Sequence, residues 1–528
     1  MSNFSQYPAV EKLKKLAEKP YDLSKEGNLT PKRIERLKSK CLNLKLLYGT
    51  ERVDEKTLEA LFDLAKEAAV YEKMQAMQAG VVMNKIEGHE SENRRVLHTA
   101  TRDFFKRQNE TEEAKEVAAL AYAELEKLKL FLDGIEKEGF TDMIQVGIGG
   151  SELGPKAVYL ALEAFKRQGR RVRFISNVDP DDAAHVLRQV DLSKTLVVIV
   201  SKSGTTLETL TNEELIRKEF LADGLSSKNH FLAVTAKGSP MDNPEKYRQT
   251  FFIWDYVGGR YSATSMVGCL ILAFALGMEK LLDFLRGASC MDKVALEEDP
   301  DANLPLLSAL LGIWNRNFLN LPTTAVIPYS RALSRFPAHL QQCDMESNGK
   351  RIDKRGNPVD FHTGPVVWGE AGTNGQHSFY QLIHQGTVAV PVEFIGFAND
   401  QYGRDSAFKG TTSQEKLLAN LFAQSIGLAT GRKSDNPNRF FPGNRPNRVL
   451  LAERCDPYTV GAILSYYENK IAFQGFIWDI NSFDQEGVRL GKVLANRIID
   501  QFDKKGKEEP FEDDFPLGAV YIDQLKKL

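Results

Sequence analysis

The sequence of 528 residues predicts an α/β protein with two doubly wound domains, mainly parallel sheets, N-terminal helices and a C-terminal tail. Continuous β-branched runs such as KTLVVIV and AVPVEFIGF alternate with amphipathic helical segments, as in parallel sheets that are covered on both faces. The chain is also too long for one hydrophobic core, and its length favours about two to four domains. We expect two domains.

The N-terminal part is predicted to be helical. Residues 30–79 begin with a Thr-Pro start signal and repeat apolar residues at spacings of three and four. No strand pattern is predicted within them. We therefore expect a helical segment over residues 1–104.

Residues 105–285 are predicted to form the first α/β domain. A long helical run, EEAKEVAALAYAELEKLKLFLDGI, precedes DMIQVGIGGSELGPKAVYLALEAF, which has the pattern of a buried strand, a glycine turn and a helix. The segments RVRFISN and KTLVVIVSKSGTTLETLTNEELIRKEF repeat this pattern, and HFLAVTA adds one more apolar strand. This alternation indicates a parallel sheet.

Residues 286–505 are predicted to form a second α/β domain. After helices that end near residue 312, TTAVIPYS predicts a strand and RALSRFPAHLQQCDME a helix. AVPVEFIGF and QEKLLANLFAQSIGLATG continue the alternation, and SDNPNRFFPGNRPN predicts a loop. Residues 506–528 form the tail, where the mixed charges of DKKGKEEPFEDDF predict a solvated segment.

The composition excludes several classes of protein. Hydrophobic residues make up 42% and charged residues 27%, as in soluble globular enzymes. Because 69 basic residues balance 71 acidic ones, no overall field attracts nucleic acid or an anionic membrane. Five dispersed cysteines favour a reducing compartment over a zinc site or disulfides. With no apolar signal region at the start, we expect a cytoplasmic protein without nucleic-acid or membrane partners.

Two hydroxyl-rich turns follow predicted strands. Gly149, Gly150 and Ser151 follow DMIQVGI, and the segment SKSGTT from Ser201 follows KTLVVIV. Glycines, hydroxyls and helix N-termini at the carboxyl ends of parallel strands favour an anion site. The alternative for the second turn is a capping box of Thr205 with Glu208, which needs no ligand. A dinucleotide fingerprint fails because Glu152 stands where its third glycine belongs, and neither turn holds a nucleotide P-loop.

Two later segments, QQCDMESNGKR and WGEAGTNGQHSFYQLIHQG, place Glu346 and His377 among Gly, Asn, Gln and Ser. Such surroundings suit a pocket for a polyhydroxylated ligand, since each hydroxyl needs a donor or an acceptor. The alternative is two ordinary surface loops. Asp344 is a competing carboxylate, but it lies two residues before Glu346 and would point elsewhere on a helix.

Together these segments resemble the signatures of the phosphoglucose isomerase family. GIGGSELGP, SKSGTTLET, GGRYSATS and GVRLGKVLANRI occur in the family's order, and SENRRVLH is similar to its N-terminal signature. The resemblance implies two SIS-type domains and a homodimer with shared active sites. It also implies the reversible isomerisation of glucose 6-phosphate to fructose 6-phosphate, in glycolysis and gluconeogenesis, through ring opening and an enediolate. No cofactor and no metal are expected.

The resemblance also implies roles for individual residues. The expected catalytic residues are Glu346 as the base, Arg260 near the enediolate oxygens, and His377 and Lys492 for ring opening. The expected substrate-binding residues are Gly150, Ser151, Ser201, Lys202, Ser203, Thr206, Gln342 and Gln485. Without the resemblance, Arg260 is as well explained as a structural ion-pair partner, Lys492 as a solvated charge and the two glutamines as surface amides.

The chain departs from the usual family pattern at Ser203 and Gly204, where Thr and Phe are common. The hydroxyl is kept, but the aromatic side chain is lost, so we expect a looser phosphate loop. Cys343 replaces an aliphatic residue, and we interpret it as a small hydrophobe. Activity on mannose 6-phosphate is left open by the sequence.

Two other functions are alternatives for this sequence. A non-catalytic sugar-phosphate sensor would need only the two turns, so the presence of Glu346 with Arg260, His377 and Lys492 argues against it. A nicotinamide-dependent oxidoreductase is disfavoured by the failed glycine fingerprint.

Overall fold

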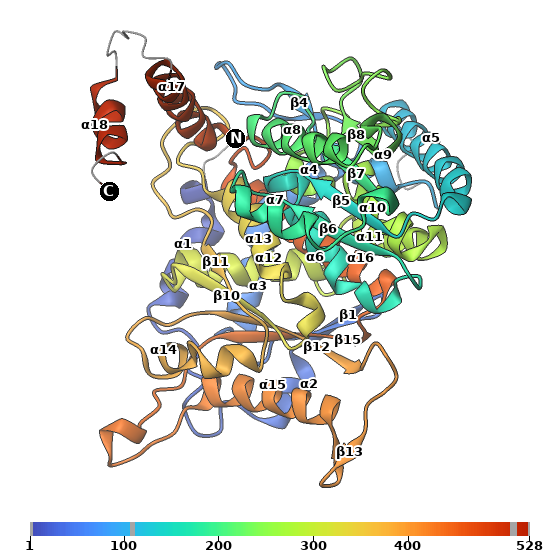
Figure 1. Ribbon diagram of the computed structural model, residues 1–528. Helices are drawn as coiled ribbons and strands as arrows, with labels where there is room; N and C mark the ends of the chain where they lie inside the picture. Colours follow the sequence, from blue (N-terminus) through green and yellow to red (C-terminus); the bar gives the residue numbers. More distant parts are fainter. Residues whose placement is uncertain (1–3, 106–110, 507–514, 526–527) are drawn as a thin grey trace. The chain divides into compact units, whose positions relative to one another are not determined.

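The computed structural model describes the chain except residues 1–3, 106–110, 507–514 and 526–527 (Figure 1). It divides into two units, Met1–Phe483 and Asp484–Leu528. The second unit contains α17 (Arg489–Gly506) and α18 (Pro516–Leu525). Most of the predicted solvated segment lies outside the described residues. The first unit contains both sheets.

The first sheet has five parallel strands in the order β6-β5-β7-β8-β9. Their bounds are Asp142–Val146 for β5, Arg171–Ile175 for β6, Thr195–Val200 for β7, Phe231–Thr235 for β8 and Gln249–Phe252 for β9. Strands β5, β7 and β8 are buried at every residue, as continuous apolar runs predict. The first α/β domain is thereby confirmed as a parallel sheet, with β9 as an unpredicted edge strand.

Helices cover both faces of this sheet. The apolar side chains of α7 (Pro180–Leu187) and α8 (Leu207–Ala222) pack against one set of alternating strand residues, including Ile144 and Ile199. The other face packs against the main core, which includes residues of α5 (Glu112–Ile135), α6 (Leu153–Ala161) and α10 (Met266–Leu276). The short helix α9 spans Ser227–His230.

The strand order of the first sheet creates a switch point. From β5 the chain runs to β6 on one side and then returns to β7 on the other side of β5. Val146 and Ile199 are paired at the carboxyl ends of β5 and β7. In doubly wound sheets, ligands bind outside the strand ends at this kind of reversal. Both hydroxyl-rich turns therefore begin at neighbouring strand ends.

The second sheet has six strands in the order β1-β2-β15-β12-β10-β11. Its parallel part consists of β10 (Thr323–Pro328), β11 (Val366–Trp368), β12 (Val392–Asn399) and β15 (Asn447–Arg454). Helices α14 (Tyr380–Gln385) and α15 (Ser413–Thr430) cover one face, on the lower side in Figure 1. A second mainly parallel sheet was predicted and is confirmed. The strand β15 was missed, because its apolar run follows a loop rich in Pro and Asn.

The prediction of uninterrupted helices over residues 30–79 was wrong. The helices α1 (Pro8–Ala17), α2 (Pro31–Arg36), α3 (Glu55–Glu67) and α4 (Val70–Gln78) are present, but β1 (Lys38–Cys41) and β2 (Leu44–Leu47) form an antiparallel hairpin between α2 and α3. Leu44 and Leu46 are buried while Lys45 between them is exposed, which is the period of a strand. The hairpin joins the second sheet through β15. The predicted domain boundaries at residues 104, 285 and 505 stay predictions.

Two short hairpins complete the strands. They are β3 (Val82–Asn84) with β4 (Arg94–Arg95), and β13 (Ala407–Phe408) with β14 (Thr411–Thr412).

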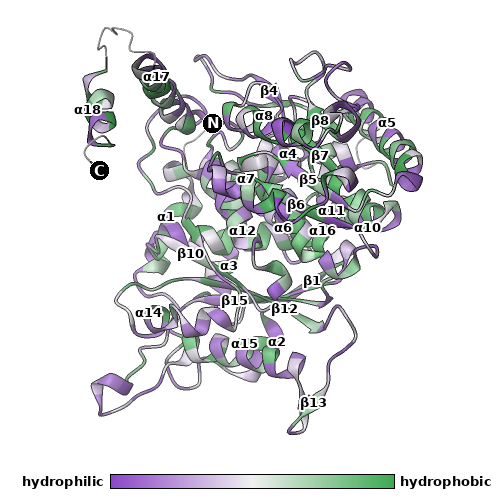
Figure 2. Cartoon of the chain, in the orientation of Figure 1, coloured by the Kyte–Doolittle hydropathy of each residue, from purple (hydrophilic) through white to green (hydrophobic). Residues whose placement is uncertain are grey.

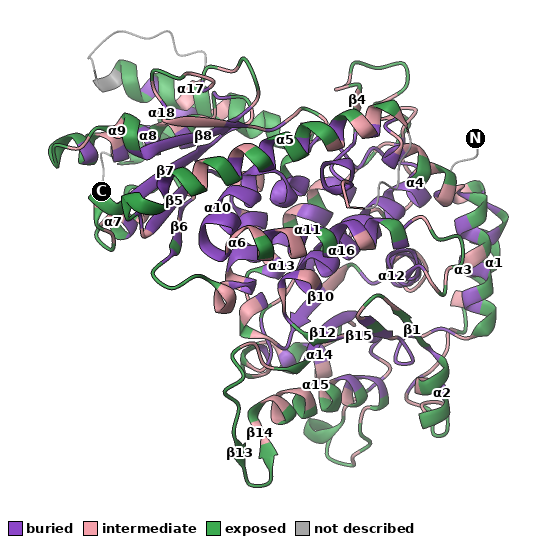
Figure 3. Ribbon diagram, turned by 90° about the vertical axis from the view of Figure 1, so that its right-hand side faces the viewer, coloured by how far each residue is buried: buried purple, intermediate pink, exposed green. Residues whose placement is uncertain are grey.

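The helix α16 (Pro457–Trp478) passes through the interior of the first unit. All of its residues except Tyr458 are buried, and it packs against α11 (Met278–Val294) and α12 (Leu304–Ile313), as the purple ribbons of Figure 3 show. Figure 2 shows hydrophobic residues along these interior helices. Residues Gly259–Leu276 are also apolar enough to cross a membrane, but 94% of this stretch is buried inside the fold.

Charged residues of α16 are paired inside the core. Arg102 donates from Nε to Asp292 at 2.6 Å and from Nη2 to Glu468 at 2.8 Å. Two residues further along the helix, Lys470 pairs with Glu393, which also pairs with Arg448. Removing one member of such a buried group leaves another charge uncompensated.

Candidate functional site

The first glycine turn is held against the GGRYS segment. The turn forms the 3-10 helix η4 (Gly149–Ser151) after β5, and GGRYS comprises the N-cap Gly258 and the first residues of η7 (Gly259–Thr264). The Ser262 hydroxyl donates to the carbonyl of Gly150 at 3.2 Å. A Cβ atom on Gly150 would lie 2.3 Å from the carbonyl carbon of Gly259, so only glycine fits here. Side chains of η7 are therefore fixed relative to the first turn.

In the second turn, hydroxyls bond to one another. Ser201 Oγ lies 2.8 Å from Thr206 Oγ1, and Ser203 Oγ accepts hydrogen bonds from the backbone N–H and the hydroxyl of Thr205. Gly204 has a φ of 70°, in the left-handed region that favours glycine. The turn therefore suits the glycine that the chain has where phenylalanine is usual.

The capping-box alternative for this turn was wrong. The N-cap of α8 is Thr206, which places Thr209 rather than Glu208 at the third helical position. The Thr206 side chain makes no capping hydrogen bond within the described residues. The N–H groups of the first helical turn thus lack a side-chain cap and can bind an anion.

The side chain of Lys202 reaches from the second turn toward the segment before η7. Its Nζ donates to the carbonyl of Val257 at 3.1 Å, one residue before the GGRYS segment. Burial lowers the pKa of Lys202, and it forms no ion pair with any carboxylate that the structure describes. A partly buried ammonium group without a carboxylate partner suits a bound phosphate.

Arg260 and Glu346 face each other within the first unit. Glu346 ends the π-helix η10 (Gln341–Glu346), which continues from α13 (Phe336–Leu340). Arg260 Nη1 lies 3.5 Å from Glu346 Oε2. The Arg260 side chain is 1% exposed and that of Glu346 is 19% exposed. Oε2 accepts no hydrogen bond from the part of the chain that the structure describes. Glu346 is therefore a partly accessible carboxylate beside a fixed cation.

Asp344, the competing carboxylate, lies in a different environment. It is buried, and the charges that act on it most are those of Lys470 and Glu393, which belong to the internal charge network. Burial raises the pKa of Asp344 to about 6. The neighbouring Cys343 is also buried, and burial raises the pKa of its thiol, in line with its interpretation as a small hydrophobe. These observations favour Glu346 as the base.

Gln342 lies in the same helix, η10, as Glu346 and is next to the first turn. A Cβ atom built on Gly149 would lie 3.4 Å from Gln342 Nε2, so the amide is next to this turn. Its Oε1 atom is buried and accepts no hydrogen bond from the described residues. The structure therefore brings Gln342, Glu346 and Arg260 together with Gly150 and Ser151. The second turn begins at the neighbouring strand.

Contacts within the first unit do not place three of the predicted residues in this group of side chains. His377 is exposed at the end of η11 (Asn374–His377), and its side chain makes no hydrogen bond with any described residue. Gln485 and Lys492 belong to the second unit, whose position relative to the first is not determined. Lys492 is exposed on α17. The roles of these residues stay predictions.

Sequence reasoning missed other residues around Arg260. Arg260 Nε donates to Ser347 Oγ at 2.7 Å, and Nη2 donates to the carbonyl of Ser482 at 2.8 Å. Tyr261 Oη lies 2.8 Å from the same Ser347 hydroxyl. Ser347 and Tyr261 are next to assigned residues in their motifs, but nothing in the sequence indicates that they meet. Ser482 is 222 residues away from Arg260 and gives no signal.

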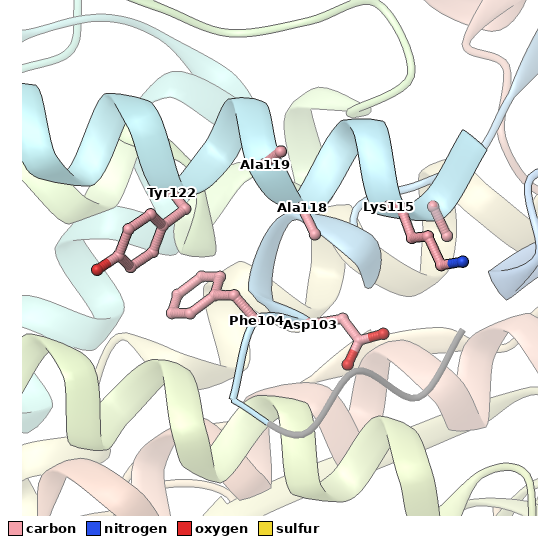
Figure 4. A pocket seen from close by; sticks show the side chains of 7 residues that line it. Asp103, Phe104, Lys115, Ala118, Ala119 and Tyr122 are labelled. Carbon is pink, nitrogen blue, oxygen red and sulfur yellow. The ribbon is translucent and has the colours of Figure 1, made fainter. Parts of the chain in front are cut away.

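A separate cavity of about 450 Å³ contains none of the predicted site residues. It lies between α5 and the residues after η2 (Ala100–Arg102), and Figure 4 shows its lining. The lining residues are Asp103, Phe104, Ala114, Lys115, Ala118, Ala119 and Tyr122.

Comparisons with known proteins agree with this geometry. A family model, Phosphoglucose isomerase, matches residues 47–515. A glucose-6-phosphate isomerase of Protochlamydia amoebophila is 57% identical over 527 residues, covering 99% of this chain and 97% of that protein. One of Desulfotalea psychrophila is 54% identical, covering 98% and 97%. The crystal structure of a glucose-6-phosphate isomerase from Chlamydia trachomatis superposes with a TM-score of 0.95 at 49% identity, covering 98% of this chain and 99% of that one. The chain therefore belongs to the phosphoglucose isomerase family.

Proposed function

We propose that this chain, an aldose–ketose isomerase by family, interconverts glucose 6-phosphate and fructose 6-phosphate in glycolysis and gluconeogenesis, with Glu346 as its base. The family match and the relatives' activity support the reaction. The observation that carries the choice of residues is the pair of Arg260 and Glu346 next to the first glycine turn.

The two turns are proposed to hold the phosphate. Gly150 and Ser151 follow β5, and Ser201, Lys202, Ser203 and Thr206 follow the adjacent β7. Backbone N–H groups, hydroxyls and the Lys202 ammonium at this switch point supply donors and positive charge for a dianion. The phosphate then fixes the sugar so that its reacting carbons lie next to Glu346.

Ring opening is proposed to come first, because the closed hemiacetal has no acidic proton on carbon 2. A group that protonates the ring oxygen and one that removes the proton of the anomeric hydroxyl convert the ring to the open aldehyde. His377 and Lys492 are assigned to these two transfers by the family motif, and Gln485 is assigned to substrate contact.

Isomerisation then moves one proton between neighbouring carbons and one between their oxygens. Glu346 removes the proton from carbon 2, and the electron pair forms a double bond between carbons 1 and 2 while the carbonyl oxygen gains negative charge. Arg260 offsets this charge, since it is fixed close to Glu346. The proton of the carbon-2 hydroxyl passes to the oxygen on carbon 1, and Glu346 returns its proton to carbon 1, which leaves the carbonyl on carbon 2 and gives the ketose. Because the substrate is neither oxidised nor reduced overall, the reaction needs no redox cofactor, and we propose no metal.

The active unit is proposed to be a cytoplasmic homodimer with shared sites. The exposed position of His377, which has no hydrogen bond to the described residues, is consistent with a role in a partner subunit's site. Dispersed free cysteines are consistent with a reducing compartment.

The test is an assay of purified protein with fructose 6-phosphate alone. Glucose 6-phosphate is measured with an excess of a coupling dehydrogenase, after the isomerase reaction has been stopped. We expect rapid formation of glucose 6-phosphate without added nicotinamide or metal. Binding of fructose 6-phosphate without turnover would instead favour the sugar-phosphate sensor.

A further inference from the structure

The geometry points to Ser347 as a positioning residue, whose hydroxyl holds the Arg260 guanidinium in place beside Glu346 and is itself held by Tyr261. This inference rests on the proposed function, in which Glu346 and Arg260 act on the substrate. Ser347 is not expected to touch the substrate. Its effect on turnover is expected to pass through Arg260.

Three of the contacts of Arg260 bear on this role. Arg260 Nε donates to Ser347 Oγ at 2.7 Å, Nη2 donates to the Ser482 carbonyl at 2.8 Å, and Nη1 lies 3.5 Å from Glu346 Oε2. Two anchors on different nitrogens of a planar group fix both its position and its rotation. Since Ser347 directly follows Glu346 in the chain, one helix end supplies both the carboxylate and an anchor for its cation.

The Ser347 hydroxyl is suited to this task by its own surroundings. Ser347, Arg260 and Tyr261 are all buried, so water does not readily replace a lost partner. Because the guanidinium can only donate, Ser347 Oγ is the acceptor of that bond. Its second hydroxyl contact is Tyr261 Oη at 2.8 Å. Burial raises the pKa of Tyr261, which keeps the phenol neutral.

Tyr261 is held in turn by a neutral ring. It stacks on His98 with ring centroids 4.5 Å apart and planes inclined by 16°. Burial, with a contribution from nearby Arg102, lowers the pKa of His98 to about 3. The imidazole is therefore uncharged at neutral pH and adds no positive charge near Arg260. The phenol that contacts Ser347 is thus fixed by packing.

Replacing the serine hydroxyl by hydrogen would remove the acceptor that Ser347 provides for the buried Nε–H of the Arg260 cation. The guanidinium would turn toward other acceptors, and Nη1 would leave its place beside the reacting carbons. For Ser347→Ala we expect kcat to fall about 10- to 100-fold, the range of a hydrogen bond to a charged group. We expect KM for fructose 6-phosphate to change less than about threefold, because the phosphate is bound at the two turns.

A double-mutant cycle separates this role from general damage. Arg260→Met keeps the length of the side chain and removes every donor. Adding Ser347→Ala to Arg260→Met should lower kcat by less than about twofold more, because no guanidinium is left to orient. If the two substitutions acted independently, the fall in kcat of the double variant would instead be the product of the two single falls.

Ser308→Ala is the matched control. Ser308 is a buried serine whose hydroxyl bonds to the hydroxyl of the buried Tyr466, on α12 and α16. It should lower Tm about as much as Ser347→Ala while kcat stays within about twofold of the parent. Tyr261→Phe serves as the second variant if Ser347→Ala does not fold. It should lower kcat in the parent but not in the Arg260→Met background.

The inference is overturned if Ser347→Ala retains kcat within about threefold, or if it lowers kcat by the same factor with and without the Arg260 guanidinium. For Tyr261→Phe the same two outcomes overturn it. A parent protein that does not isomerise fructose 6-phosphate would refute the proposed function itself. The two failures are therefore distinguishable.

Discussion

Glu346→Gln should remove proton transfer while leaving the fold and substrate binding in place. The amide has the size of the carboxylate but is not basic, and the Glu346 side chain is 19% exposed. Arg260 keeps its bonds to Ser347 and to the Ser482 carbonyl in the variant. The phosphate turns do not involve residue 346. The substitution thus removes the basicity and the negative charge of this one side chain.

The expected loss follows from the role of a general base, which contributes about 10²- to 10⁴-fold to a rate. At about 1.36 kcal/mol for each tenfold change, this corresponds to about 2.7 to 5.4 kcal/mol of activation free energy. We expect KM to change little, because the ion pair of Arg260 and Glu346 is replaced by a contact that an amide oxygen can still make. Tm should stay close to that of the parent.

The assay combines two measurements on the same protein. The first is kcat for the conversion of fructose 6-phosphate, and the second is solvent deuterium exchange at carbon 2 of glucose 6-phosphate. Both should fall by a similar factor. Asp344→Asn is the comparison, since this buried carboxyl faces Lys470 rather than the site and its loss should leave proton exchange intact. Exchange that continues at near the parent rate in Glu346→Gln would refute the assignment of the base.

Three further outcomes are expected. Ser203→Asp should raise KM strongly and leave Tm unchanged, because it places a negative charge where the phosphate is expected to bind; unchanged kinetics would move the phosphate away from this turn. His377→Ala should slow turnover of the closed ring more than that of an open-chain substrate, and mixed dimers with Glu346→Gln should regain activity if subunits share sites; hybrids as inactive as their parents would contradict sharing. Asp344→Asn should gain Tm relative to the parent as pH rises from about 4 to about 7, since the folded pKa of about 6 exceeds the ordinary 3.8; a constant Tm difference across this range would contradict the burial argument.

The sign of the last prediction follows from proton binding. Between about pH 4 and pH 6, the folded protein holds a proton on Asp344 that the unfolded chain has released. Stability from this group is therefore lost as pH rises, and the asparagine variant avoids that loss.

The parallel strands β5, β6, β7, β8, β10 and β12 were predictable from sequence, because buried strands such as β7 are continuous apolar runs, whereas the parallel strands β9, β11 and β15 were missed. The hairpin of β1 and β2 was not predictable either, since its short alternating stretch lies between good helices, and β15, which pairs with β2, is about 400 residues away. Local patterns do not contain such pairings.

The candidate site was likewise only partly predictable from the sequence. Sequence motifs identified Arg260 and Glu346, and in the structure Arg260 Nη1 lies 3.5 Å from Glu346 Oε2. They did not identify the anchors of Arg260, because Ser347 and the Ser482 carbonyl are defined only by tertiary contacts. The capping box of Thr205 and Glu208 was plausible by spacing alone, and it failed because α8 begins one residue later than that motif requires.

The helix α16 is buried around almost its whole circumference, so the burial of a single apolar stripe does not fix its rotation about its own axis. Its charges do so. Glu468 and Lys470 are two residues apart, project to opposite sides and meet Arg102 and Glu393 respectively. A quarter turn of the helix would break both ion pairs at once.

The rotation of α16 about its axis also affects the position of Glu346. Asn348, two residues after Glu346, donates from Nδ2 to the Ile471 carbonyl of α16 at 3.1 Å. Glu468→Gln would remove the ion pair with Arg102 and so allow α16 to rotate. Although Glu468 is remote from Glu346 in sequence, this rotation would shift Asn348 and with it the backbone that carries the Glu346 carboxylate.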